Sequence, residues 1–210
     1  MRQNVTSADG CSAQSNTASK YRSFTIRPAR SEQDMQTTAA LIKAYTASLG
    51  IDLTFQNFST EMASFPGKYA PPEGEILLAI DDQPRSGVGA GVADGEGEVL
   101  GCICLRPLIP KSFLPDDADT SRQDIVKSEK RCCEMKRLYV LPSTRGRGVG
   151  KALVMAFLQV ARDRGYNEVK LDTLRHMHTP IELYRSLGFT DIEKYYETPL
   201  DETVFLGREL

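Results

Sequence analysis

A glycine-rich turn between a strand-like segment and an amphipathic helix constrains the fold of this chain more than any other feature. The turn reads RGRGVG at 145–150 and follows the apolar segment 133–140. A helix is predicted from about 148 to 164, because Leu153 and Phe157 fall on one face. Glycine lets the backbone approach a ligand closely, and the N–H groups of a first helical turn have no acceptor inside the helix. The pattern therefore predicts an anion site at this turn.

Besides an anion site, this turn has three other possible interpretations. A dinucleotide fingerprint requires G-x-G-x-x-G, whereas Gly146, Gly148 and Gly150 alternate here. The Lys-Ser/Thr pair of a P-loop is missing. A plain connection between a strand and a helix stays open on the residues alone. Positive charge is added by three side chains: Arg145, Arg147 and Lys151.

The order of strand-like and helix-like segments predicts a mixed α/β sheet. Strands are expected at 24–27, 75–80, 99–105, 133–140, 169–173, 189–194 and 203–208. Besides the helix after the glycine-rich turn, helices are expected from Ser31 to Gly50, over 58–64, and from Thr179 to Gly188. The strands at 75–80 and 99–105 are expected to form an antiparallel hairpin, and Ser31 with Asp34 comes close to a capping box.

The domain organisation follows from where polar sequence without periodicity lies. Residues 1–22 are predicted to be a disordered tail, and 23–210 a single domain. Residues 83–97 are predicted to form a turn, and 111–130 a long loop whose role stays open. Of all residues, 40% are hydrophobic, which is enough for one ordinary core.

Composition excludes several classes of protein. The net charge is -2, so nucleic acid is not expected as the main partner. The longest apolar runs, such as 76–80, are too short to cross a bilayer, and the N-terminus lacks the apolar stretch of a secretory signal, so no membrane partner is expected. The five cysteines include adjacent pairs with poor spacing for disulfides or zinc. Reduced thiols, no metal site and a cytoplasmic location are therefore expected.

Two motifs resemble the GCN5-related N-acetyltransferase (GNAT) family. Arg145, Gly148 and Gly150 match the pattern Arg/Gln-x-x-Gly-x-Gly/Ala, and LYRSLGF at 183–189 matches Leu-Tyr-x-x-x-Gly-Phe. The resemblance is specific over 134–189. It implies the GNAT fold, an α/β fold with a mixed, mostly antiparallel sheet of about six to seven strands flanked by helices. It also implies acetyl-CoA as a co-substrate.

The resemblance further implies roles for named positions. The backbone of Leu138, Tyr139 and Val140 would pair with the pantetheine arm, with the Val140 N–H facing the thioester oxygen. Tyr184 would lie near the sulfur and donate a proton. Many members carry Asn where this chain has Met177, which is a departure from the family pattern. The pyrophosphate would be held by backbone amides of Arg145, Gly146, Arg147, Gly148, Val149, Gly150 and Lys151.

Glu134 is the candidate general base. It lies six residues before Val140, the spacing of the base in histone-acetylating members of the family. Strand alternation would place Glu134, Lys136, Leu138 and Val140 on one face. The alternative is a structural role for Glu134 as a partner of Lys136 or Arg137.

Core packing is the alternative role for Tyr184. Leu183 and Leu187 are expected to be the core pair of their helix, which would free Tyr184 for another face. His176 and His178 are expected to be loop residues rather than bases. Residues 195–196, both Tyr, either close the substrate pocket or pack on a strand.

These observations predict an N-acetyltransferase that transfers the acetyl group of acetyl-CoA directly to a primary amine, with a small molecule as the acceptor. Near-neutral charge favours a small molecule over a protein or peptide acceptor, which is one alternative. Another alternative is a CoA-binding sensor without turnover, against which Glu134 and Tyr184 argue. The acceptor, the pathway and the oligomeric state, a homodimer included, are left open.

Overall fold

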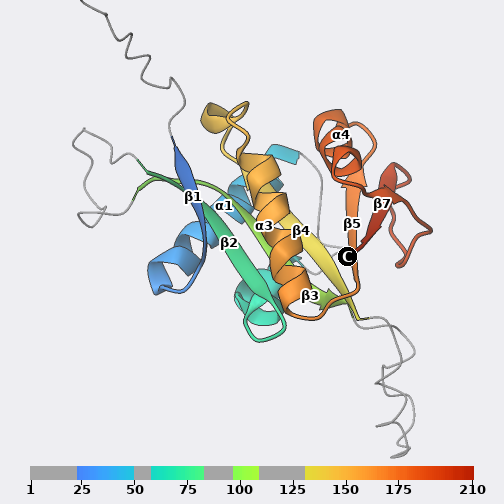
Figure 1. Ribbon diagram of the computed structural model, residues 1–210, viewed down its shortest axis with the longest axis horizontal. Coiled ribbons are helices and arrows are strands. Elements are labelled where there is room, and N and C mark those ends of the chain that lie inside the picture. The colour runs from blue at the N-terminus through green and yellow to red at the C-terminus, as the bar shows by residue number, and fades with distance from the viewer. Residues whose placement is uncertain (1–22, 50–57, 83–96, 109–130) are drawn as a thin grey trace, which may run out of the picture.

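A seven-stranded sheet in the order β1-β2-β3-β4-β5-β7-β6 runs through the part of the chain that this computed structural model describes, residues 23–49, 58–82, 97–108 and 131–210 (Figure 1). The strands are β1 Phe24–Pro28, β2 Glu75–Asp81, β3 Val99–Leu108, β4 Cys132–Val140, β5 Glu168–Leu174, β6 Thr190–Asp191 and β7 Thr203–Glu209. Only β4 and β5 pair in parallel; all other neighbours in this sheet are antiparallel. The predicted mixed, mostly antiparallel α/β sheet is therefore confirmed.

Helices cover both faces of the sheet (Figure 1). Their bounds are α1 Glu32–Leu49, α2 Phe58–Ala63, α3 Val149–Asp163 and α4 His178–Ser186, with short 3-10 turns at Gly67–Tyr69 and Pro142–Thr144. One buried cluster joins α3 and Tyr184 of α4 to one face, and a second joins Leu41 and Ile42 of α1 to the other. The sheet is thus the middle layer of three.

The start of α1 bears out the predicted capping box. The Ser31 hydroxyl accepts a hydrogen bond from the Asp34 N–H at 3.1 Å, and the Asp34 carboxylate accepts one from the Ser31 N–H at 3.1 Å. The predicted hairpin is also confirmed, since β2 and β3 pair antiparallel from Glu75↔Leu105 onwards.

Two predicted boundaries were wrong. The helix α4 begins at His178 with Met177 at its N-cap, rather than with Thr179 as the cap. Pro180 is tolerated inside the first turn because the N–H that it lacks would have no acceptor within the helix there. The strand expected over 189–194 shrinks to Thr190–Asp191.

A β-bulge in β4 changes which side chains share a face. Cys102 pairs with Tyr139 and Cys104 with Lys136, so one residue of β3 lies opposite two of β4, and Arg137 there has φ 58°. A bulge of this kind shifts the alternation of side chains by one residue. As a result Met135, Leu138 and Val140 all contact the cluster on the α3 side.

The bulge overturns the expectation that Glu134, Lys136, Leu138 and Val140 share one face. Glu134 and Lys136 flank Met135 in the strand and so point away from the α3 side. Leu138 and Val140 point toward it.

The sheet opens between its two parallel strands, and the opening begins just before the bulge. The pairing of β4 with β5 covers Cys132↔Glu168 to Glu134↔Lys170, and within these two fully described strands it does not continue further. Both strands run on and diverge toward the end of the sheet that carries the start of α3 and α4 (Figure 1). On the side that faces β5, the open part of β4 has no pairing strand among the described residues, so its backbone can meet a ligand.

Several predictions concern residues outside the described ranges. These are the tail at 1–22, the loop at 111–130, and all of the turn at 83–97 except Gly97. The division into a tail and one domain over 23–210 stays a prediction.

Candidate functional site

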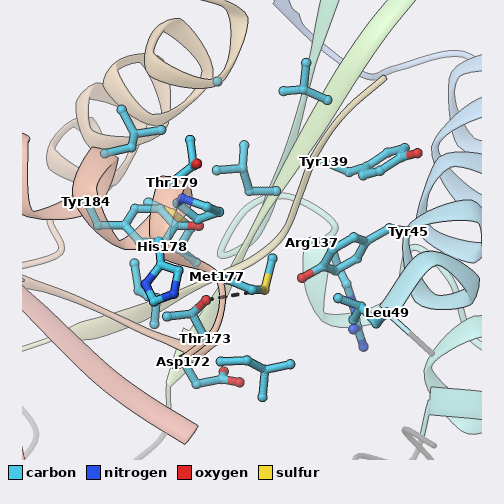
Figure 2. A pocket seen from close by; sticks show the side chains of 18 of the residues that line it. Tyr45, Leu49, Arg137, Tyr139, Asp172, Thr173, Met177, His178, Thr179 and Tyr184 are labelled. Atoms are coloured by element: carbon cyan, nitrogen blue, oxygen red, sulfur yellow. Dashed lines mark hydrogen bonds between the residues drawn. The ribbon is translucent and has the colours of Figure 1, made fainter. Parts of the chain in front are cut away.

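A pocket of about 790 Å³ lies in the opening between β4 and β5. Its walls come from the open part of β4, the glycine-rich turn, the end of β5, the first turns of α4 and the end of α1. Figure 2 shows Tyr184 of α4 on one side of the pocket and Tyr45, Arg137 and Leu49 on the other. The volume lies within the range of about 300–1,000 Å³ that is usual for small-ligand sites.

The glycine-rich turn has the backbone geometry of an anion site. Gly146 and Gly148 have φ of 79° and 81°, and Gly148 is the N-cap of α3. The Ala152 N–H makes the first helical bond, to the Gly148 carbonyl. Within the described part of the chain, the N–H groups of residues 149–151 have no hydrogen-bond acceptor. These donors and the positive end of the helix dipole lie at one end of the pocket.

The positive side chains of the turn differ in what they do. Arg145 and Lys151 are exposed and line the pocket. Arg147 instead turns toward β2 and forms an ion pair with Asp81 at 3.1 Å. Arg147 is not among the residues that line the pocket, so a part for its backbone N–H in binding an anion there stays a prediction.

The predicted residues of β4 line the pocket from both faces of the sheet. Leu138 and Val140 line it from the α3 side of the sheet, and Tyr139 lines it from the other side, where its ring lies 5.6 Å from that of Tyr45. At the opening between β4 and β5, these three residues therefore contribute side chains from both faces of the sheet and a backbone edge that β5 does not pair with.

Tyr184 lines the pocket and is also part of the core. It is 7% exposed, and its ring meets Phe189 edge-on with centroids 5.8 Å apart. The expectation that Leu183 and Leu187 are the core pair was wrong: α4 buries Ile181 and Tyr184, while the two leucines are partly buried. Burial raises the pKa of the Tyr184 hydroxyl, so it is protonated at neutral pH.

Glu134 is enclosed behind the pocket wall rather than in the lining. It is 1% exposed, and Arg106 contacts one of its oxygens at 2.6 Å. The other oxygen accepts a hydrogen bond from the Tyr195 hydroxyl at 2.9 Å and lies 3.5 Å from the Lys136 ammonium. The structural alternative for Glu134 thus has a geometric basis, and its role as a base stays a prediction.

Other candidates take positions that the sequence had left open or discounted. Tyr195 and Tyr196 pack with Phe205 on the sheet, with centroids 5.2–5.3 Å apart, and do not line the described part of the pocket. His176 and His178 are exposed and line the pocket, and His178 opens α4 instead of lying in a loop.

Two pocket residues were missed by sequence reasoning. Tyr45 comes from α1, whose position next to β4 no local pattern reveals. Asp172 lies in β5 between the buried residues Leu171 and Thr173. Because β5 alternates between polar and buried residues, Asp172 falls in the same set as Glu168 and Lys170, so no local signal marked it.

Over the described ranges, no cluster of His, Cys, Asp or Glu could hold a metal ion. Cys102, Cys104, Cys132 and Cys133 are free thiols, and Cys11 lies outside these ranges. Among the described helices, none combines the length and the apolar character that crossing a bilayer requires.

Known proteins share both the sequence pattern and the fold. The profile of the Acetyltransferase (GNAT) family matches residues 55–189. An uncharacterized N-acetyltransferase from Schizosaccharomyces pombe is 32% identical over 191 residues, which cover 91% of this chain and 98% of that protein. Human N-acetyltransferase 8B is 41% identical over 98 residues, covering 47% of this chain and 37% of that protein.

Solved structures show the same architecture at lower identity. An acetyltransferase from Streptococcus agalactiae has a TM-score of 0.59 at 17% identity, covering 89% of this chain and 98% of that one. Arabidopsis thaliana NAA60, in complex with a bisubstrate analogue, has a TM-score of 0.59 at 16% identity, covering 90% and 99%.

Proposed function

This chain belongs to the Acetyltransferase (GNAT) family, and we propose that it transfers the acetyl group of acetyl-CoA to the primary amine of a small molecule. Membership of the family makes it an acyl-CoA N-acyltransferase. The observation that carries the proposal is the single pocket that joins the glycine-rich turn, the free edge of β4 and Tyr184.

Acetyl-CoA fits this pocket in one direction. Its pyrophosphate would lie at the start of α3, where Arg145 and Lys151 add charge to the free N–H groups. Its pantetheine arm would pair with the backbone of residues 138–140, as an added strand pairs with an open sheet edge. The thioester would then lie near Tyr184, which lines the pocket from the opposite side.

The proposed reaction is a direct transfer. The amine nitrogen forms a bond with the carbonyl carbon, and the Val140 N–H stabilises the oxyanion. The carbon–sulfur bond then breaks, and Tyr184 gives its proton to the departing thiolate. The proton that the amine loses restores the tyrosine, so CoA leaves as the thiol. Tyr184 is proposed for this role because it lines the pocket opposite the open part of β4 and its hydroxyl is protonated at neutral pH.

The acceptor is proposed to be a small molecule because the pocket volume of about 790 Å³ leaves limited room beside the pantetheine arm. The test is release of CoA thiol with a panel of aliphatic amines, amino-acid amides and short peptides with a free N-terminus. Turnover restricted to the peptides would replace the proposed acceptor class. Binding of acetyl-CoA without any turnover would favour the sensor alternative.

A further inference from the structure

Asp172 is the single carboxylate among the described residues that line the pocket. It lies on β5, directly across the opening from Lys136 of β4. Since Leu171 belongs to the cluster on the α3 side, alternation along the strand directs Asp172 to the opposite side of the sheet, toward α1. In Figure 2 it lies beside Thr173 and below Met177, with Arg137 and Leu49 across the pocket.

The two nearby carboxylates outside the pocket lining are already bound at both oxygens. Glu134 is held by Arg106, Tyr195 and Lys136, as described above. Glu61 of α2 accepts two hydrogen bonds from the Arg137 guanidinium, both at 2.9 Å, and a third from Tyr69 at 3.1 Å. Both oxygens of each of these carboxylates are therefore already engaged within the protein, and neither group lines the pocket.

Asp172 keeps capacity to accept hydrogen bonds. Lys136 donates to its Oδ1 at 2.6 Å, and the Tyr196 hydroxyl lies close enough to the same carboxylate to help lower its pKa. An ionised carboxylate offers about four lone-pair sites. Burial raises the pKa of Asp172, but the charge and hydrogen bond of Lys136, with a smaller contribution from the Tyr196 hydroxyl, outweigh burial and hold this pKa below its usual value. The group is therefore a charged acceptor at neutral pH.

We propose that Asp172 binds the amino group of the acceptor and orients it toward the thioester. This inference rests on the proposed function. An N–H of the amine donates to Asp172, which leaves the nitrogen lone pair free to attack the carbonyl carbon. Asp172 thereby sets the specificity for acceptors with an N–H donor, while acetyl-CoA is bound by the other end of the pocket.

The experiment compares Asp172→Asn with wild type in the full chain, using the best amine from the acceptor panel. The amide keeps the size of the side chain but loses the charge. Because the variant weakens a hydrogen bond between the amine and a charged group, we expect the KM for the amine to rise about 10- to 100-fold. The dissociation constant for acetyl-CoA, measured by calorimetry, should stay unchanged. Asp191→Asn, an exposed aspartate of β6 paired with Arg185, is the matched control.

A second variant distinguishes loss of amine binding from a folding defect. Asp172→Asn leaves the Lys136 ammonium without its nearest partner, so the double variant Asp172→Asn with Lys136→Met is measured in parallel. Both variants should show the same selective increase in KM for the amine. An unchanged KM, or an equal loss of acetyl-CoA affinity, would overturn the inference and leave the proposed function standing. No turnover of wild type with any amine would overturn the proposed function, and this inference with it.

Discussion

The guanidinium of Arg137 and the carboxylate of Glu61 form a two-point ion pair, with both contacts at 2.9 Å, that ties α2 to the bulge of β4. Arg137 is at the same time the residue with φ 58° in that bulge. The side chain is 4% exposed and lies over the Phe58 ring of α2, with its central carbon 5.2 Å from the ring centroid. One buried charge pair therefore fixes both the helix and the bulge of β4 beside the opening of the sheet.

Glu61→Ala should lower the free energy of unfolding by about 3–5 kcal/mol, because it leaves the buried Arg137 charge without its partner. The measurement is urea unfolding followed by circular dichroism. The double variant Glu61→Leu with Arg137→Met should lose much less, since no charge is stranded. If the double variant lost as much as Glu61→Ala, packing of α2 would matter more than the ion pair.

The sequence predicted the order of elements, and local signals explain why. Ser31 with Asp34 marked the start of α1, and the glycine-rich turn marked the start of α3. The face of Glu134 was mispredicted because the bulge at Arg137 depends on pairing with β3, which strand alternation alone does not reveal. Asp172 was missed for a similar reason: its partner Lys136 lies on another strand.

Gly148→Ala should weaken acetyl-CoA binding. Nothing lies within 4 Å of an added Cβ at this position, so crowding by the protein is not the reason. With φ of 81°, any other residue is strained by about 1–2 kcal/mol and would shift the free N–H groups of the turn. Calorimetry with acetyl-CoA measures the loss.

Gly165→Ala is the matched control for that variant. Gly165 follows α3 with φ of 75°, so the same backbone strain applies at the far end of the helix. It should lower the melting temperature without changing acetyl-CoA affinity. Equal affinities for wild type and Gly148→Ala would mean that the phosphates bind elsewhere.

Tyr184→Phe should lower kcat while the dissociation constant of acetyl-CoA stays near that of wild type. The ring keeps its edge-on contact with Phe189, but the proton donor is lost. Loss of a general acid typically costs about 10²–10⁴-fold in rate. Steady-state kinetics with a single amine give the answer, and an unchanged kcat would leave Tyr184 with packing alone.

Asp34→Asn should destabilise the fold at neutral pH by about 2–3 kcal/mol. Hydrogen bonds from Arg27, Arg30 and Ser31 hold the pKa of Asp34 well below its usual value. A carboxylate with a lowered folded-state pKa stabilises fully above its unfolded pKa of about 3.9 and loses this contribution as pH falls. The difference between wild type and Asp34→Asn, from urea unfolding, should therefore shrink below about pH 5. A difference that does not change with pH would show that the charge is not its cause.

The variant Glu134→Gln distinguishes two roles of Glu134, that of a general base and that of a buried structural carboxylate. Its carboxylate is enclosed by Arg106, Lys136 and Tyr195, so we expect the structural role, with a loss of about 3–5 kcal/mol in unfolding free energy. The ratio of kcat/KM between wild type and variant should then be constant with pH.

A base would give the opposite profile. An alkylamine has a pKa of about 10.4, so it is almost fully protonated near neutral pH, and a base recovers part of the cost of removing that proton. The deficit of Glu134→Gln would then shrink as pH rises toward the pKa of the amine, because the free amine becomes abundant. An arylamine has a low pKa and would flatten the ratio in either case, so the profile must be measured with an aliphatic acceptor. A ratio that approaches one at high pH with such an acceptor would establish Glu134 as the base, acting through the pocket wall by way of water.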